Sequence, residues 1–267
     1  MSVNPSDWLK INRDSWDQRT KIHIGSDFYD VEAFKKEGDS LNEIELDLLG
    51  NIKSQKILHL QCHFGMDTLS LEKHGAIATG VDFSKEAITH ANSLKKEMDM
   101  SSEFICSNIY DLDLTNSHEF DKIFCSYGIC GWLPDLNEWA KIISKHLKSG
   151  STFTIVDFHP TVWMFDDEFK NITYSYFNKK PYIEIESGSY ASKIEQEEIT
   201  SIWWNHGLSE IMQALLENEL DLISFKEYDY SPYDCFQNTV KISNKKYRIE
   251  HLDNKIPMVY SMHFKKK

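Results

Sequence analysis

Residues 56–91 read KILHLQCHFGMDTLSLEKHGAIATGVDFSKEAITHA, and this stretch decides the fold. Two short apolar runs, Lys56–Cys62 and Ala76–Asp82, have the length and composition of buried strands. Each run is followed by an amphipathic segment, at Asp67–His74 and at Ser84–Glu97. A strand followed by a helix, repeated along the chain, is typical of a parallel sheet that is covered by helices.

The same alternation continues beyond residue 91. It predicts further strands at Glu103–Ser107, Phe120–Ser126 and Ser151–Phe158, with a helix from Pro134 to Leu147. Residues 159–206 are rich in aromatic side chains and short alternating runs, which predicts a strand-containing insertion. The last predicted elements are a helix at Gly207–Glu219 and strands at Asp221–Tyr228 and Met258–Phe264, which a loop separates.

Together these elements predict an α/β fold. We expect a Rossmann-like three-layer sandwich with a seven-stranded, mostly parallel sheet and an antiparallel last strand. The insertion at residues 159–206 comes after strand five and is expected to lie over one end of the sheet, as a cap on the substrate. A length of 267 residues suits a single domain over residues 1–267.

Composition and charge exclude several classes of protein. The net charge of −13 makes non-specific attraction to nucleic acid or to anionic lipid unfavourable. No apolar run approaches the roughly 18 residues of a membrane-spanning helix, and the start of the chain lacks a signal-peptide pattern. The five cysteines are odd in number and lack CxxC spacing, which indicates free thiols. We therefore expect a cytoplasmic protein with no nucleic-acid or membrane partner.

Asp82 is the most informative polar residue in the opening stretch. It ends the second predicted strand, 17 residues after Gly65, where a carboxylate can accept both hydroxyls of a ribose. The alternative is that Asp82 only caps the helix that begins at Ser84. A dinucleotide would need G-x-G-x-x-G, but Gln61 and His63 stand where glycines would be, and no phosphate-binding GxxxxGK[ST] loop is present. S-adenosylmethionine has no phosphate, so a loop with side chains at these two positions suits it better than it suits a dinucleotide.

The stretch at 56–91 resembles motif I and the following acidic motif of class I S-adenosylmethionine-dependent methyltransferases. It is similar to an uncharacterised bacterial subgroup that has LHLQCHxG in place of the usual D-x-G-x-G-x-G. Residues 126–150, SYGICGWLPDLNEWAKIISKHLKSG, and the later His159-Pro160 resemble the same subgroup. The resemblance covers about residues 16–160 and, more weakly, 207–219.

The resemblance implies S-adenosylmethionine as the cofactor and S-adenosylhomocysteine as its product. It places residues along the cofactor in order: the methionine end at Gln61, His63, Gly65 and Thr68; the ribose at Asp82; the adenine beside Phe83 and Ser84 and facing Asn108 and Ile109; and the sulfonium above Ser126, Tyr127 and Gly128. It also implies that residues 1–53 form a helical lid, with Trp16, Arg19 and Tyr29 as contacts. Simple helix packing is the alternative for these three residues.

Methyl transfer needs a donor and a nucleophile that are aligned and shielded from water, and a general base only if the nucleophile carries a proton. His159 directly follows strand five and is the candidate base or substrate contact, and Tyr127 is a second catalytic candidate. His206 and Trp132 are candidate substrate contacts. A structural role is the alternative for each histidine. Neither the histidines nor the cysteines show metal-ligand spacing, so we expect no metal.

The sequence thus predicts a methyltransferase that acts on a small-molecule acceptor. A protein or nucleic-acid methyltransferase is one alternative. A non-catalytic regulatory protein that binds S-adenosylmethionine or a nucleotide is another, because the usual motif I glycines are missing. Both a monomer and a homodimer are compatible with the sequence.

Overall fold

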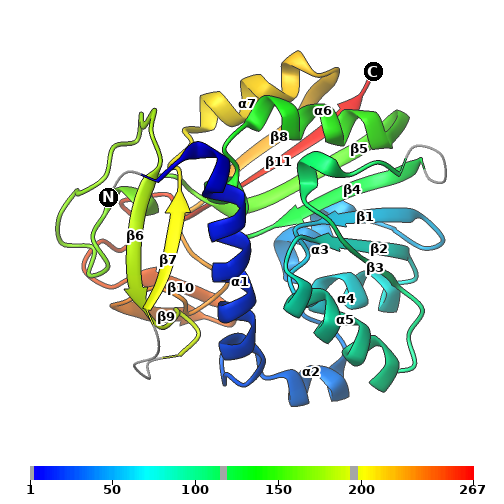
Figure 1. Cartoon of the computed structure of the whole chain (residues 1–267), viewed down its shortest axis with the longest axis horizontal. Helices are drawn as coiled ribbons and strands as arrows, with labels where there is room; N and C mark the ends of the chain where they lie inside the picture. Colours follow the sequence, from blue (N-terminus) through cyan, green and yellow to red (C-terminus); the bar gives the residue numbers. More distant parts are fainter. Residues whose placement is uncertain (1–2, 115–118, 193–197) are drawn as a thin grey trace.

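The computed structural model describes residues 3–114, 119–192 and 198–267. A seven-stranded sheet with the order β3-β2-β1-β4-β5-β11-β8 forms its centre (Figure 1). The strands are β1 (Lys56–Leu60), β2 (Ile77–Asp82), β3 (Glu103–Cys106), β4 (Phe120–Ser126), β5 (Leu147–Phe158), β8 (Leu220–Tyr228) and β11 (Val259–Lys266). The first five strands are parallel, and β11 lies antiparallel between β5 and β8. The predicted Rossmann-like sheet is confirmed.

Seven α-helices are present in the described residues (Figure 1). They are α1 (Trp8–Ile24), α2 (Val31–Glu37), α3 (Glu43–Leu49), α4 (Met66–Lys73), α5 (Lys85–Glu97), α6 (Leu136–His146) and α7 (Leu208–Glu217). Trp139 of α6 is fully buried against Phe153 of β5, with ring centroids 5.6 Å apart. Leu49 of α3 and Leu71 of α4 pack in a separate apolar cluster with Ile57 of β1. Apolar side chains are thus removed from water on both faces of the sheet, which stabilises the three layers.

The insertion contains two antiparallel strands, β6 (Tyr182–Ser187) and β7 (Glu198–Trp203), and β7 packs beside α1 (Figure 1). A second hairpin, formed by β9 (Thr239–Ser243) and β10 (Lys246–Ile249), was not predicted. The expectation of a plain loop between Tyr228 and Met258 is therefore wrong. Most residues of β9 are exposed, so the hairpin lacks the apolar run by which a buried strand is recognised.

The order of the strands fixes where a ligand can bind. The chain reverses its direction of travel across the sheet between β1 and β4, and ligands of open α/β sheets bind at this switch point, outside the carboxyl ends of the strands. Gln61 connects the loop after β1 to the loop after β4, because its Nε2 donates to the Ile129 carbonyl oxygen at 3.4 Å.

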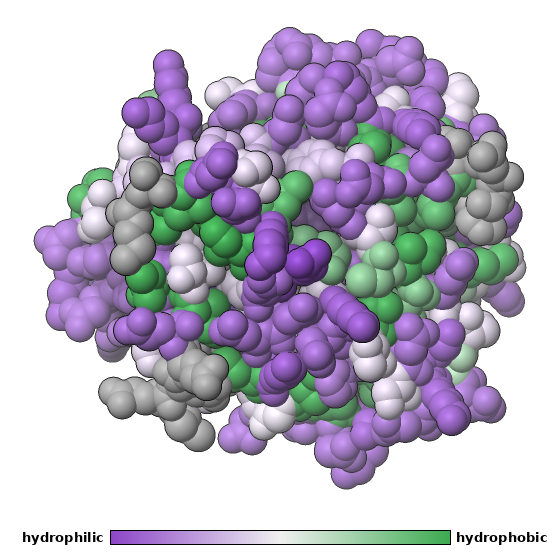
Figure 2. All heavy atoms as spheres, in the orientation of Figure 1, coloured by the Kyte–Doolittle hydropathy of each residue, from purple (hydrophilic) through white to green (hydrophobic). Residues whose placement is uncertain are grey.

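The surface is largely hydrophilic on the face shown in Figure 2, with small hydrophobic patches, in keeping with the charged residues in the composition. Within residues 3–114, 119–192 and 198–267, no helix is long and apolar enough to cross a membrane.

Candidate functional site

The loop after β1 has the backbone of a glycine-rich loop although it keeps one glycine. Gln61, His63 and Gly65 have φ angles of 55°, 53° and 86°, all in the left-handed region. Glycine adopts this region freely, whereas other residues pay about 1–2 kcal/mol. A Cβ at Gly65 would lie 2.5 Å from the Phe104 ring, so glycine is required there for packing against β3. Gln61 and His63 therefore hold strained positions and direct side chains to the switch point.

Asp82 joins the ends of β1 and β2. Its Oδ2 accepts the His63 backbone N–H at 2.9 Å, and its Oδ1 accepts the Ser84 N–H at 2.9 Å. Burial raises the pKa of Asp82 to about 6, although the Ser84 and His63 N–H groups oppose the shift. An ionised carboxylate offers about four lone-pair sites, so acceptor capacity for two hydroxyls remains. Helix α5 is capped by Ser84, whose Oγ accepts the Ala87 N–H, so the cap does not depend on Asp82 alone.

Aromatic rings from the N-terminal segment pack on the β1 loop. The ring centroids of Trp16, His23 and Tyr29 lie 5.4, 5.0 and 5.4 Å from that of His63. Burial lowers the pKa of His63 to about 3 and that of His23 to about 2, so both rings are neutral at pH 7. We call Trp16, His23, Tyr29 and His63 the aromatic cluster. Trp16 also meets Trp132, with ring centroids 5.3 Å apart.

Arg19 connects α1 to the insertion. Its Nη2 donates to Glu186 Oε2 on β6 at 2.5 Å and to Ser201 Oγ on β7 at 2.9 Å. Asn12 adds a pair of hydrogen bonds to the Ile202 backbone, at 2.7 and 2.9 Å. The guanidinium of Arg19 is thus used in holding α1 to the β6–β7 hairpin, which gives the helix-packing interpretation a direct basis. Its predicted cofactor contact stays a prediction.

The turn after β4 is shaped by Asp157 at the end of β5. Its Oδ1 accepts the Gly128 N–H at 2.5 Å, and its Oδ2 accepts the Cys130 N–H at 3.1 Å. These bonds hold Tyr127, with φ 39°, and Gly128, with φ 75°, in left-handed conformations. Ser126 Oγ donates to Asp67 Oδ2 of α4 at 2.9 Å. Ser126, Tyr127 and Gly128 therefore lie in the turn after β4, beside the switch point, and their predicted place under the sulfonium stays a prediction.

The remaining predicted cofactor residues are engaged locally. Thr68 is fully buried, with its Oγ1 2.8 Å from Nδ1 of His59. Asn108 Oδ1 accepts the Tyr110 N–H at 3.3 Å, and Ile109 packs into the main core. Phe83 is half-buried in the turn between Asp82 and Ser84. Asn108, Ile109 and Phe83 lie just after the ends of strands, and Thr68 lies in the first turn of α4. Their contacts with adenine or methionine stay predictions.

The two histidines predicted near the substrate have their hydrogen-bond partners outside the aromatic cluster. His159 Nε2 is 3.0 Å from Glu227 Oε1 on β8, and its Nδ1 accepts the Thr161 N–H at 3.1 Å. Burial lowers the pKa of His159, and Glu227 opposes the shift. His206 Nε2 lies 2.8 Å from the Leu133 carbonyl oxygen, and its ring stacks on Trp204. Both histidines thus have structural partners, and their catalytic and substrate roles stay predictions.

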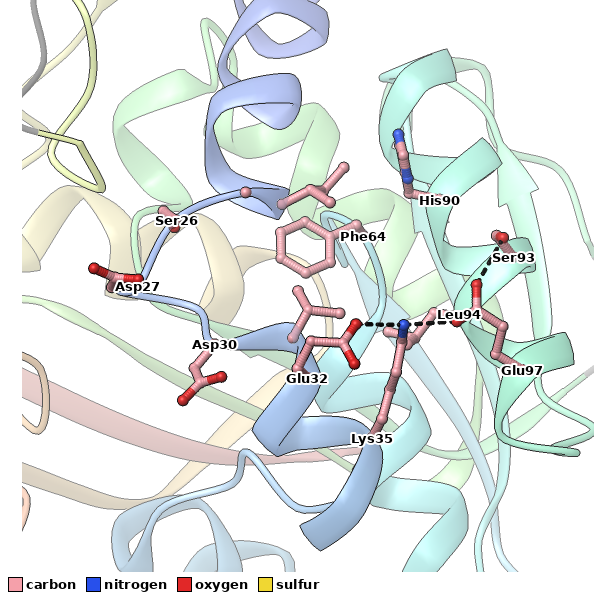
Figure 3. A pocket seen from close by; sticks show the side chains of 13 residues that line it. Ser26, Asp27, Asp30, Glu32, Lys35, Phe64, His90, Ser93, Leu94 and Glu97 are labelled. Carbon is pink, nitrogen blue, oxygen red and sulfur yellow. Dashed lines mark hydrogen bonds and ion pairs between the residues drawn. The ribbon is translucent and has the colours of Figure 1, made fainter.

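A cavity of about 340 Å³ lies next to Phe64, between the end of α1, α2 and α5 (Figure 3). Lys35 crosses it, with its Nζ 2.7 Å from Glu32 Oε1 and 2.6 Å from Glu97 Oε2. Its lining contains none of the cofactor-binding residues that the sequence predicts. The cavity therefore borders the loop after β1 at Phe64 without reaching the predicted cofactor residues.

Several residues at the switch point were not among the predicted site residues. They are Glu45, Asp67, Asp157 and Tyr233, and from the N-terminal segment Asp17 and His23. Asp157 could have been found by extending the strand-end rule to strand five. Nothing in the sequence marks Glu45 or Tyr233. Among the described residues, no group of three or more histidine, cysteine, aspartate or glutamate side chains is arranged to hold a metal ion.

The chain is similar to known methyltransferases in family, sequence and structure. Residues 57–150 match the model of a family described as "Methyltransferase domain". A ubiquinone biosynthesis O-methyltransferase of Coxiella burnetii is 28% identical over 99 residues, which cover 37% of this chain. The match spans 42% of the length of that relative.

Two solved structures illustrate the structural likeness. An S-adenosylmethionine dependent methyltransferase from Mesorhizobium loti matches with a TM-score of 0.55 and 16% identity, over 82% of this chain and 94% of that one. A geranyl diphosphate C-methyltransferase from Streptomyces coelicolor, crystallised with S-adenosyl-L-homocysteine, matches with a TM-score of 0.56 and 13% identity, over 84% and 74%. Residues 57–150 thus match a methyltransferase domain, and the chain shares the Rossmann-like fold of these solved S-adenosylmethionine-dependent methyltransferases.

Proposed function

We propose that this protein is a methyltransferase that moves a methyl group from S-adenosylmethionine to a small-molecule acceptor by in-line displacement. The observation that carries the proposal is the left-handed β1 loop with the Asp82 carboxylate beside it at the switch point. The matching methyltransferase domain over residues 57–150 supports it.

Unpartnered polar atoms at the switch point fit a polar cofactor. Gln61 Oε1 and the Tyr127 hydroxyl are buried, and neither has a partner at normal hydrogen-bond distance in the described part of the chain, although Glu45 interacts with the hydroxyl. A buried polar atom without a partner costs about 1–3 kcal/mol, which a polar ligand would recover. These two atoms come from the loops after β1 and β4, on either side of the switch point. With the spare acceptor capacity of Asp82, they form a donor and acceptor set that suits S-adenosylmethionine.

The cofactor supplies a methyl group that is already activated by positive sulfur. The protein's own residues then have three tasks. Asp82 would hold the ribose and so fix the position of the donor. Gln61 and Tyr127 would orient its amino-acid end, and the aromatic cluster would exclude water. Alignment of this kind accounts for much of the rate of a displacement that needs little other chemistry from the protein.

A small-molecule acceptor is the finer part of the proposal. The relatives named as ubiquinone biosynthesis O-methyltransferases and as a geranyl diphosphate C-methyltransferase support it, by the substrates in their names. The net charge of −13 argues against a nucleic-acid acceptor. We also propose a cytoplasmic location, which suits the five cysteines, all free thiols.

Calorimetric titration with S-adenosylmethionine tests the cofactor, and transfer of a labelled methyl group to a panel of small phenols, amines and carboxylates tests the activity. We expect binding, and transfer to at least one acceptor class. Asp82→Ala is the matched control and should weaken binding. If millimolar S-adenosylmethionine does not bind, the proposal is wrong. Binding without transfer to any acceptor would favour the alternative of a regulatory binding protein.

A further inference from the structure

Two histidines of the aromatic cluster share a hydrogen bond at the switch point. His23 of α1 is fully buried, and its Nδ1 lies 3.3 Å from Nε2 of His63 in the loop after β1. The other ring nitrogen of His23, Nε2, lies 2.6 Å from Ser189 Oγ, in the segment between β6 and β7. A continuous chain of hydrogen bonds therefore runs from His63 through His23 to Ser189.

The two ends of this chain are able to form further hydrogen bonds. His63 is partly exposed, and its Nδ1 has no hydrogen-bond partner in the part of the chain that the structure describes. Ser189 is also partly exposed, and its Oγ accepts the Ala191 N–H at 3.4 Å. A hydroxyl donates one hydrogen bond and accepts two, so Ser189 can take a proton from His23 and give its own proton to water.

Both imidazole rings are neutral at pH 7. Burial lowers the pKa of His63 to about 3, and burial, followed by the charges of His63 and Arg19, lowers that of His23 to about 2. A neutral imidazole has one N–H and one bare nitrogen, so it can accept a proton on one side and release one on the other. Because burial disfavours the charged ring, neither histidine holds a second proton at pH 7, and each is suited to passing a proton on.

We infer that His63, His23 and Ser189 carry a proton from the methyl acceptor to solvent, and that the acceptor group is a hydroxyl. The inference rests on the proposed function. A hydroxyl is a weak nucleophile until it loses its proton, whereas a carboxylate is already ionised and an amine attacks through its lone pair. The aromatic cluster would keep water away from the switch point, so a proton released there needs a route of its own.

The proton moves in one direction along the chain. As the acceptor oxygen bonds to the methyl carbon, its O–H proton passes to Nδ1 of His63; the C–S bond breaks and its electron pair stays on sulfur. His63 gives its Nε2 proton to Nδ1 of His23, which gives its Nε2 proton to Ser189 Oγ, and Ser189 releases its own proton to water. When the product leaves, His63 loses its Nδ1 proton to water and the chain takes up one proton at Ser189, which restores the starting rings. One proton is released in each turnover.

A purely structural role is the alternative for these contacts. The chain of hydrogen bonds links α1, the loop after β1 and the insertion, and the hydroxyls of Tyr29 and Tyr190, 2.5 Å apart, add a second link between the N-terminal segment and the insertion. The two roles differ in what they require of residue 23. An amide side chain can donate and accept hydrogen bonds as a neutral imidazole does, but it cannot pass a proton from one side to the other.

Methyl transfer to two phenols of different pKa distinguishes the two roles. An ordinary phenol titrates near pH 10 and is protonated at about pH 8, whereas a nitrophenol is largely ionised there. His23→Gln should slow transfer to the ordinary phenol by about 100-fold or more, the usual contribution of a positioned proton acceptor, and should leave transfer to the nitrophenol close to the wild-type rate. His74→Gln, which alters a partly exposed imidazole paired with Asp39, is the matched control and should change neither rate.

His63→Gly gives a second measurement, because glycine suits the φ of 53° and the change removes only the imidazole. The variant should bind S-adenosylmethionine and transfer slowly to the ordinary phenol, and added imidazole should restore much of the rate. If His23→Gln does not fold by circular dichroism, Ser189→Ala replaces it and should slow transfer to the ordinary phenol alone.

The outcomes separate the inference from the proposed function. If wild-type protein methylates phenols, and the variants keep its rate on the ordinary phenol or slow both phenols equally, the inference is wrong and the proposed function stands. If wild-type protein methylates only amines or carboxylates, the inference is also wrong. If it methylates no acceptor, the proposed function is wrong and the inference falls with it.

Discussion

Gly65→Ala should destabilise the protein by about 2–5 kcal/mol, the sum of two costs. The first is the left-handed backbone of residue 65, with φ 86°, which costs an alanine about 1–2 kcal/mol. The second is overpacking. A Cβ would lie 2.5 and 2.6 Å from two atoms of the Phe104 ring and 3.0 Å from the Ala91 Cβ, and forcing such contacts costs about 1–3 kcal/mol.

Urea unfolding monitored by circular dichroism measures this change. Gly131→Ala is the control, because a Cβ there would meet only the Trp204 carbonyl oxygen, at 3.4 Å. Phe104→Leu should recover part of the overpacking cost in the double variant but none of the backbone cost, so the two changes should couple by about 1 kcal/mol or more. A loss below 1 kcal/mol for Gly65→Ala, or strictly additive effects in the double variant, would refute the assignment of Gly65 to packing against β3.

Three further predictions concern the switch point. Asp82→Ala should weaken S-adenosylmethionine binding by about 1.5–3 kcal/mol, the value of hydrogen bonds to a charged group; unchanged affinity by calorimetry would show that Asp82 does not hold the ribose. His63→Gly removes a left-handed non-glycine residue and an imidazole packed against Trp16 and Tyr29, so donor affinity should stay the same or rise; a tenfold loss would mean that the imidazole itself binds the cofactor. Burial lowers the pKa of His23 to about 2. Its contribution to the free energy of unfolding is complete above about pH 6.5 and falls progressively as the pH drops from 6.5 toward 2, because the unfolded chain then binds a proton that the folded chain does not. His23→Gln should therefore lose less unfolding free energy between pH 6.5 and pH 5 than wild type does. An equal loss in both proteins, measured by urea unfolding at the two pH values, would contradict this.

Local patterns in the sequence were enough to predict the sheet. The strands at Lys56–Leu60 and Ile77–Asp82 are buried apolar runs followed by helices. Runs this short are typical of buried strands and are shorter than most buried helices. The β9–β10 hairpin escaped because it is held by backbone pairing and carries exposed side chains, which leave no period in the sequence. The strand-end rule placed Asp82 and Tyr127 at the switch point for the same reason that it placed the strands.

The sequence alone determined which strand ends meet and which loops lie at the switch point, because strand order in an α/β sheet follows from short right-handed connections between neighbouring elements. Only the tertiary structure decided which other side chains reach that place. Asn42 and Tyr233 are 191 residues apart in the chain yet share a hydrogen bond beside Glu45. Contacts of this kind depend on how the helices and loops that cover the sheet pack, and packing between distant segments is not encoded in the period of either one.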